Sequence, residues 1–254
     1  MTTIAALRRE QLVEELLRQG GASVADLSAR LRVSEATIRR DLDTLERAGR
    51  LRRAHGGALA PAGGGEQSVR EREALFGEEK RRIGAAAAAL IVDGDTIAMT
   101  GGTTTLQVAR SIPQGSNCTV VTNAVDIVLE LARRPGLTVI ATGGRLRPNT
   151  LELVGPLAEQ TLGQLFVDKA FIGVNGLTLE AGLTTHDETE AVISRIMIRA
   201  AREVIVVADR SKLSRVALAR MGDLAQVRTL ITDKGADQDI LAALERAGID
   251  VVAV

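Results

Sequence analysis

The chain is poor in residues on which several functional classes depend. It has no tryptophan or tyrosine and only three phenylalanines, which argues against the aromatic stacking surfaces that bind single-stranded nucleic acid. Its single cysteine, Cys118, rules out an internal disulfide and is expected to be buried. The two histidines and this cysteine do not have metal-ligand spacing. The sequence therefore predicts neither a metal nor another cofactor.

Long hydrophobic runs are also missing. The longest, residues 85–92, is far shorter than a membrane span. The first twelve residues include Arg8, Arg9 and Glu10 where a signal peptide would have its apolar core. We therefore expect a cytoplasmic protein that does not bind membranes. The chain does have 254 residues, 45% of them hydrophobic, which is enough for two domains with buried cores.

The formal net charge is zero, but the charges are unevenly distributed. Residues 1–60 hold eleven arginines and eight acidic residues, whereas the remainder has a small acidic excess. A basic N-terminal part on a slightly acidic body fits local contact with DNA better than binding to a membrane surface.

Three regions differ in their residue pattern. We expect a DNA-binding domain at residues 1–60, a linker at 61–75 that opens with a glycine-rich stretch, and an α/β domain at 76–254. In the last region short apolar strands alternate with helices, which predicts a largely parallel sheet. The predicted strands are residues 96–100, 119–122, 138–141, 169–173, 204–208, 229–232 and 250–254. The predicted helices include residues 80–91, 123–134 and 188–201.

The N-terminal region has the pattern of a winged helix-turn-helix. Helices are predicted at residues 4–18, 24–31 and 34–48, with Ser23 and Ser34 as N-caps. In the third helix Ile38, Leu42 and Leu45 are spaced to face a core. The other face, and the arginine-rich glycine turn after it, are predicted to contact DNA. The candidates are Ser34, Glu35, Ala36, Thr37, Arg39, Arg40, Asp43 and Arg47 on the helix, and Arg52, Arg53 and His55 in the wing.

An arginine near the start of such a helix can donate two hydrogen bonds to guanine O6 and N7. The alternative is a plain three-helix bundle with solvated charges, which the arginine-rich turn disfavours. The run Ser-Glu-Ala-Thr-Ile-Arg-Arg-Asp-Leu at residues 34–42, then Leu45, then Arg-Ala-His-Gly-Gly-Ala at 53–58, resembles the winged helix-turn-helix of DeoR-family bacterial regulators. The resemblance implies that residues 34–46 form the recognition helix and that the wing ends at the glycine pair.

The first predicted strand of the α/β region runs into two glycines and three threonines. Glycines let the backbone approach a ligand, and free N–H groups, the helix dipole and threonine hydroxyls favour an anion such as phosphate. The run has neither the lysine of a P-loop nor dinucleotide-fingerprint spacing. A tight turn with a threonine cap is the alternative. The residues are Gly101, Gly102, Thr103, Thr104 and Thr105.

Two further polar segments follow predicted strands. They contain Gly143 and Gly144 in one case and Lys212 in the other. Because ligands of open α/β sheets bind outside the carboxyl ends of the strands, we expect all three segments to gather at one edge. Lys212 would supply a point charge for a phosphate or a sugar hydroxyl; the alternative is a solvated surface lysine.

Strings across most of the remaining chain resemble the C-terminal sensor domain of the DeoR family. They lie at residues 122–124, 153–156, 168–173, 182–185, 190–191 and 208–212. That sensor is similar in fold to ribose-5-phosphate isomerases and coenzyme A transferases, which implies a phosphorylated sugar or related metabolite as effector. The resemblance places residues 101–105 at the phosphate and Asp168, Asn175, Glu190 and Lys212 around the sugar.

The chain departs from the isomerase pattern where catalysis would need it. That pattern has an Asp-Gly-Ala-Asp-Glu run, and this chain has Ile-Gly-Val-Asn-Gly at residues 172–176. General acid–base catalysis needs a titratable group on the proton's path, and valine and asparagine cannot serve. We therefore predict no catalytic residues and no enzyme activity.

Together these features predict a DNA-binding transcriptional regulator, and the family suggests a repressor of carbohydrate-metabolism genes controlled by a phosphorylated sugar. An operator with two half-sites needs two heads, so the predicted partners are double-stranded operator DNA and further copies of the chain in a dimer or tetramer. One alternative is a sugar-phosphate isomerase-like enzyme with an appended DNA-binding module. Another is a constitutive DNA-binding protein whose body only oligomerises.

Overall fold

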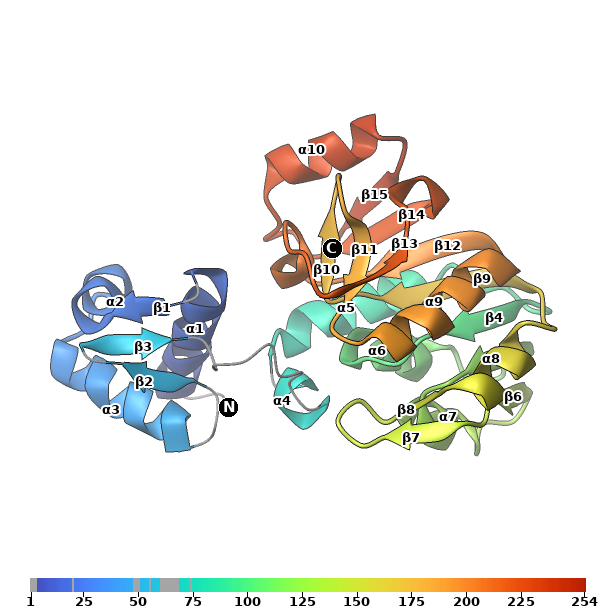
Figure 1. The fold of residues 1–254 in the computed structure, drawn as a ribbon, viewed down its shortest axis with the longest axis horizontal. Coiled ribbons are helices and arrows are strands. Elements are labelled where there is room, and N and C mark those ends of the chain that lie inside the picture. The colour runs from blue at the N-terminus through green and yellow to red at the C-terminus, as the bar shows by residue number, and fades with distance from the viewer. Residues whose placement is uncertain (1–3, 20, 48–50, 55, 60–68, 74) are drawn as a thin grey trace. The chain divides into compact units, whose positions relative to one another are not determined.

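The computed structural model in Figure 1 describes residues 4–19, 21–47, 51–54, 56–59, 69–73 and 75–254. The chain forms two compact units, Met1–Gln67 and Ser68–Val254. In the described residues no helix combines the length and the hydropathy that crossing a membrane requires.

The first unit is a winged helix-turn-helix, as the sequence predicts. Helices α1 (Ile4–Gln19), α2 (Val24–Leu31) and α3 (Glu35–Arg47) accompany a three-stranded sheet with the order β1-β3-β2. Ser23 caps α2 by accepting a hydrogen bond from the Asp26 N–H. Leu12, Leu27 and Ile38, one from each helix, are fully buried in its core.

The wing consists of β2 (Arg52–Ala54) and β3 (Gly57–Leu59), and β1 (Gly21–Ser23) pairs with β3. The sequence does not predict β1, since three small residues carry no periodic signal and the strand exists only through its pairing. Gly57 is required here: a Cβ at this position would lie 2.3 Å from the Ala22 carbonyl oxygen.

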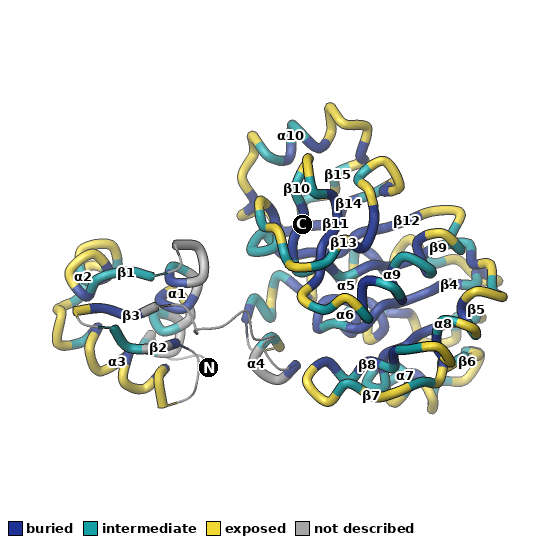
Figure 2. The backbone as a smooth tube through the Cα atoms, viewed as in Figure 1, coloured by how far each residue is buried: buried dark blue, intermediate teal, exposed yellow. Residues whose placement is uncertain are grey.

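The second unit is built on a seven-stranded sheet, and its central strands are largely buried (Figure 2). All neighbouring strands pair in parallel, in the order β15-β14-β12-β9-β4-β5-β6. Each predicted strand is found in this sheet, so the prediction of a parallel α/β domain is confirmed. The strands are β4 (Thr96–Met99), β5 (Cys118–Thr122), β6 (Leu137–Ala141), β9 (Val167–Gly173), β12 (Ala201–Val207), β14 (Thr229–Thr232) and β15 (Asp250–Ala253).

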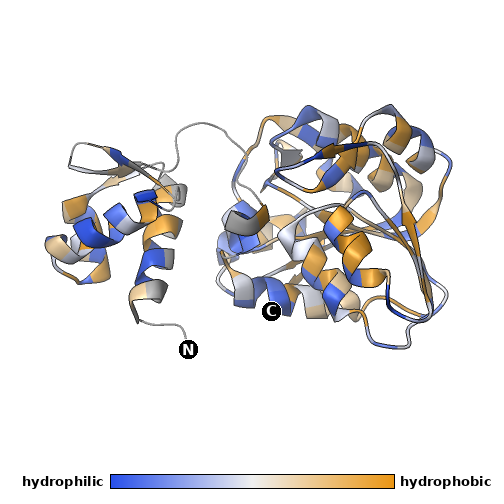
Figure 3. Ribbon diagram, turned by 90° about the horizontal axis from the view of Figure 1, so that it is seen from below, coloured by the Kyte–Doolittle hydropathy of each residue, from blue (hydrophilic) through white to orange (hydrophobic). Residues whose placement is uncertain are grey.

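Helices cover both faces of this sheet, and the alternation of side chains along β9 shows how. Phe171 packs in the core shared with α5, α6 and α7, whereas Ala170 and Ile172 belong to the core shared with α8, α9 and α10. Figure 3 shows helices that carry both hydrophobic and hydrophilic residues, as amphipathic packing requires. The helices are α5 (Gly77–Ala88), α6 (Thr103–Ser111), α7 (Val125–Leu131), α8 (Pro156–Leu162), α9 (Glu188–Ala200) and α10 (Gln238–Arg246).

Short elements outside the large sheet are absent from the sequence prediction. β7 (Arg145–Arg147) and β8 (Glu152–Val154) form a hairpin, and β10 (Gly176–Thr178), β11 (Gly182–Thr185) and β13 (Ala219–Gly222) form a second small sheet. Short 3₁₀ helices span Arg210–Lys212 and Leu224–Gln226.

The predicted linker at residues 61–75 is too long at its C-terminal end. Residues Val69–Glu73 form helix α4, which belongs to the second unit. The Val69 N–H donates to the Asn149 carbonyl over 3.0 Å, and the Lys80 ammonium donates to the Arg72 carbonyl over 2.5 Å. Five residues are too few for a helical period to show in the sequence, and these tertiary contacts hold the helix.

Candidate DNA-binding and effector sites

The outward face of α3 presents most of the predicted DNA-contacting side chains to solvent. Ser34 precedes the helix, and its hydroxyl accepts from the Thr37 N–H and lies 2.9 Å from the Thr37 hydroxyl. Among the described residues, the Arg40 side chain has no hydrogen-bond or ion-pair partner. An unpaired guanidinium on an exposed helix face is available for a base edge or a phosphate. The exposed residues are Ser34, Glu35, Ala36, Arg39, Arg40, Asp43 and Arg47.

Some of these side chains also bind one another. Arg39 forms an ion pair with Glu35 at 2.7 Å, one helical turn away. Arg53 of the wing lies 3.4 Å from Asp43 of α3, so the wing and the recognition helix are joined by a charge pair. His55 and the side chain of Arg52 lie outside the described residues, and their roles stay predictions.

The buried carboxylate of Asp41 was not singled out from the sequence. It accepts hydrogen bonds from Arg8 at 2.6 Å and Arg9 at 2.8 Å, which ties α1 to the recognition helix. Burial alone would raise the pKa of Asp41, but the hydrogen bonds and charges of the two arginines outweigh it and lower that pKa below its ordinary value. This site therefore fixes the orientation of α3 rather than contacting DNA itself.

In the second unit, the glycine–threonine loop joins β4 to α6. Gly102 is the N-cap of α6 and offers no side chain to its free N–H groups. Thr103, Thr104 and Thr105 are buried, and the Thr105 hydroxyl donates to the Gly102 carbonyl at 2.8 Å. The loop thus leaves the backbone donors at the N-terminus of α6 without a side-chain cap, which is the arrangement that favours an anion.

A carboxylate from the β7–β8 hairpin packs against this loop. Glu152 is buried, and a Cβ on Gly101 would lie 2.3 Å from its Oε1 atom, so a larger residue at Gly101 would require the Glu152 side chain to move. The Asn123 side chain donates to Glu152 at 3.2 Å, and its own Oδ1 is buried without a partner in the structure. A buried acceptor without a partner marks a place where a ligand hydroxyl or water can donate.

Other predicted effector residues lie at the same carboxyl edge of the sheet. Gly143 and Gly144 follow β6, and Asn175 follows β9. The Thr185 hydroxyl bridges Asn175 at 2.8 Å and Glu190 at 3.1 Å. Glu190 lies in the first turn of α9.

Glu190 is held by an arginine that the sequence did not single out. Arg147 of β7 forms ion pairs with Glu190 and, at 3.2 Å, with Asp187, the N-cap of α9. The charge of Arg147 also helps to lower the pKa of Asp187 below its ordinary value, against the effect of burial. Arg147 thus engages both carboxylates at the start of α9, an arrangement that fits hydrogen bonding to hydroxyls better than proton transfer.

Lys212 ends the segment after β12, the neighbour of β9. Among the described residues no hydrogen bond or ion pair of its ammonium is found. Burial lowers the pKa of Lys212, Asp209 acts in the opposite direction, and the positive charges of Arg72 and Arg215 lower it further. Asp209 is fully buried, and its Oδ2 atom has no hydrogen-bond partner.

The structure does not bring Asp168 to this edge. Asp168 lies at the start of β9, where it accepts from the Thr96 N–H at 2.9 Å and lies 3.4 Å from Arg202. Thr96 and Arg202 are themselves at the beginnings of β4 and β12. Because the strands are parallel, Asp168 is at the opposite edge from Gly101 and Lys212 and cannot share their ligand.

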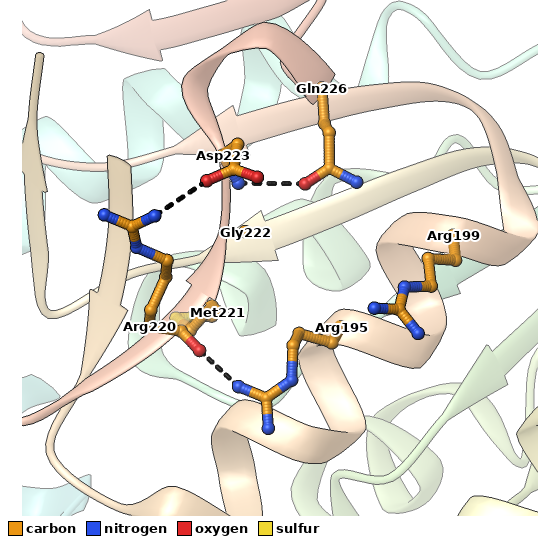
Figure 4. Close-up of a pocket in the computed structure, with 7 residues that line it drawn as sticks. All are labelled: Arg195, Arg199, Arg220, Met221, Gly222, Asp223 and Gln226. Carbon is orange, nitrogen blue, oxygen red and sulfur yellow. Dashed lines mark hydrogen bonds and ion pairs between the residues drawn. The ribbon is translucent and has the colours of Figure 1, made fainter. Parts of the chain in front are cut away.

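A surface pocket lies between α9 and β13 (Figure 4) and contains none of the predicted effector residues. Arg220 there pairs with Asp223 at 3.0 Å, and the Arg195 guanidinium donates to the Arg220 carbonyl. The described part of the chain contains no group of histidine, cysteine and carboxylate residues suited to a metal ion.

Comparison with known proteins gives the same two-part division. The model of the DeoR-like helix-turn-helix domain matches residues 8–62, and that of the DeoR C terminal sensor domain matches residues 76–234. The HTH-type transcriptional regulator GlpR of Haloferax volcanii is 38% identical over 250 residues, covering 98% of each chain. The glycerol-3-phosphate regulon repressor of Escherichia coli K12 is 31% identical over 226 residues, covering 89% of this chain and 90% of the relative.

Among solved structures, ribose 5-phosphate isomerase A of Methanocaldococcus jannaschii matches with a TM-score of 0.41 and 16% identity, over 54% of this chain and 55% of the isomerase. Nothing about function follows from so weak a likeness. The fold and the site define a winged helix-turn-helix transcriptional regulator with an effector-sensing α/β domain. The chain belongs to the DeoR family of such regulators.

Proposed function

We propose that the chain is a repressor that releases its operator when a phosphorylated sugar or a related metabolite binds the second unit. The observation that carries this proposal is the glycine–threonine loop, whose backbone donors have no side-chain cap. The hydrogen-bonded pair Asn123 and Glu152 lies next to this loop. Asn175 and Lys212 follow strands at the same edge of the sheet. Backbone N–H groups suit a phosphate, and carboxylate and amide groups suit sugar hydroxyls. The relative named for a glycerol-3-phosphate regulon supports a phosphorylated effector.

On this proposal the protein works as a homo-oligomer and not as an enzyme. Two half-sites of an operator are bound by two recognition helices, so a dimer or a tetramer is the binding unit. Asn175 cannot transfer a proton, and Glu190 is paired with Arg147. Isomerisation of a sugar phosphate that Lys212→Ala abolishes would overturn the regulator proposal.

The test uses an operator selected from random duplex DNA with the full chain. Fluorescence anisotropy of that duplex, at one stated salt concentration, is then followed during titration with a panel of sugar phosphates and their unphosphorylated sugars. The proposal predicts that at least one phosphorylated compound releases the DNA while its parent sugar does not. If no compound changes the affinity, the chain is a constitutive DNA-binding protein and the proposal is wrong.

Thr104→Val separates sensing from DNA binding. Thr104 is buried in the first turn of α6, and valine keeps its shape while removing its hydroxyl. We expect effector affinity to fall about tenfold, the equivalent of one hydrogen bond to a charged group, with unchanged affinity for the operator. Loss of both activities would instead show that Thr104 is needed for folding.

A further inference from the structure

Arg72 on helix α4 has donors without an acceptor among the residues that the structure describes. Its Nε and Nη2 atoms are buried and have no hydrogen-bond partner. Its carbonyl oxygen, in contrast, accepts from the Lys80 ammonium at 2.5 Å. A buried guanidinium without an acceptor is costly, so an acceptor that completes this site is expected.

Positively charged side chains act on one another around Lys212. Among the described residues the Lys212 ammonium has no hydrogen-bond or ion-pair partner, and the charges of Arg72 and Arg215 both act on it. The pKa of Lys80 is affected by the charges of four neighbouring residues, Asp209, Lys212, Arg72 and Glu73. Glu73 is engaged elsewhere, in an ion pair with Arg110 at 3.0 Å. The charge of Asp209 acts on Lys80, Lys212 and Arg215, and the charge of Arg72 acts on Lys80 and Lys212.

These cations do not have equal roles. The Lys80 ammonium is already used, because it donates to the carbonyl oxygens of Arg72 and Leu75. It holds the end of α4 against the start of α5. The donors of Arg72 and the ammonium of Lys212 remain for a ligand, and a planar guanidinium beside an ammonium is well suited to phosphate.

We propose that Arg72, together with Lys212, binds the phosphate of the effector and thereby couples occupancy of the sensor site to helix α4. This inference rests on the proposed function, since it assigns a further residue to the same site. It adds a residue from outside the sheet edge, and it assigns that residue a regulatory role.

The position of α4 explains why this contact matters for DNA binding. α4 is the first element of the second unit and follows the linker from the DNA-binding unit directly in sequence. Figure 1 shows it beside the start of α5 and the β7–β8 hairpin, and Val69 bonds to Asn149 in the turn of that hairpin. The same hairpin carries Arg147 and Glu152 of the effector site. A ligand that binds Arg72 therefore stabilises the docked α4, the element of the second unit that is nearest in sequence to the DNA-binding unit.

The test measures binding of inorganic phosphate to the full chain by isothermal titration calorimetry, with potassium chloride as the control for ionic strength. We expect phosphate affinity to fall about tenfold or more in Arg72→Gln, as loss of a charge-assisted hydrogen bond requires, and less in Arg72→Lys. Arg82→Gln is the matched control, because Arg82 is exposed on α5 and has no partner among the described residues. Its phosphate affinity should equal that of the wild type.

Two results would overturn the inference: a wild-type chain that does not bind phosphate, or Arg72→Gln binding phosphate as well as Arg82→Gln does. In the second case, phosphate binding by Thr104→Val is measured as well. If this variant binds phosphate more weakly than the wild type does, the glycine–threonine loop is still a phosphate site and only the role of Arg72 is wrong. Failure of the proposed function is separate, since it would appear as sugar phosphates that leave the operator complex unchanged.

A measurement on the wild type covers the case in which Arg72→Gln does not fold. Hydrogen exchange of the full chain is compared with and without phosphate. Peptides covering α4 should exchange more slowly in the presence of phosphate. Peptides covering α10, which is remote in sequence and packs in the core with α8 and α9, should exchange at an unchanged rate. Equal exchange of α4 in both conditions would contradict the coupling.

Discussion

The buried ammonium of Lys80 gives the folded chain a pH signature that can be calculated. Lys80 is 4% exposed and donates to the carbonyl oxygens of Arg72 at 2.5 Å and Leu75 at 2.7 Å. Burial lowers its pKa from 10.5 to about 8, although the charge of Asp209 acts in the opposite direction. Between these two values the unfolded chain binds more protons than the folded chain, so the free energy of unfolding rises with pH.

The size of the effect follows from the pKa difference. One unit corresponds to about 1.4 kcal/mol, so holding Lys80 charged in the folded chain costs about 3 kcal/mol below pH 8. Raising the pH from about 7 to about 10 removes most of that cost, and the contribution of Lys80 to stability improves by about 2 kcal/mol.

The assay compares the wild type with Lys80→Met by chemical denaturation, followed by circular dichroism across this pH range. The chain has only four lysines and no tyrosine, so few other groups titrate there, and those that do are common to both proteins. We expect the wild type to gain about 2 kcal/mol relative to Lys80→Met as the pH rises. Lys234→Met, at an exposed position, should follow the wild type. Parallel stability curves for the wild type and Lys80→Met would refute the reasoning.

Three further substitutions test other parts of the account. Arg40→Ala should cost about 1–3 kcal/mol of operator binding and relax preference at one base position, measured with single-base operator variants; equal weakening on all sequences would make Arg40 a phosphate contact. Asp41→Asn should destabilise the first unit by about 2 kcal/mol in thermal or chemical denaturation. Because the folded pKa of Asp41 is lowered, this difference is present above about pH 3.8 and disappears as the pH falls through the folded value, and a pH-independent difference would contradict the ion-pair explanation. Gly101→Ala would bring a Cβ within 2.3 Å of Glu152 and should cost about 1–3 kcal/mol of stability, so an unchanged unfolding midpoint would show that the carboxylate moves freely.

The large elements were predictable from the sequence because each carries its own periodic signal. The seven apolar strands and the spacing of Ile38, Leu42 and Leu45 on α3 are examples. The short strands β1, β7 and β8 were missed because their formation depends on pairing partners rather than on local pattern. Helix α4 was missed for a similar reason, since its contacts to Asn149 and Lys80 are made across the fold.

The candidate site was predictable where a polar loop follows a parallel strand, and less so elsewhere. Gly101 and Lys212 were placed correctly at the carboxyl edge by strand direction alone. The same reasoning argues against Asp168, which lies at the N-terminal end of its strand and is implied only by the family resemblance. Strand direction could not identify Glu152 and Arg147, because they lie on the β7–β8 hairpin, whose strands are too short to show a pattern in the sequence.

The most direct test of the central claim is the reciprocal coupling between effector and operator. Affinity for the sugar phosphate that releases DNA is measured by calorimetry with the free protein and with the protein saturated with operator. Linkage requires that the effector bind the free protein more tightly, by about 5- to 150-fold for a typical coupling energy. Equal affinities in the two states would contradict a regulator whose effector site controls its DNA-binding unit.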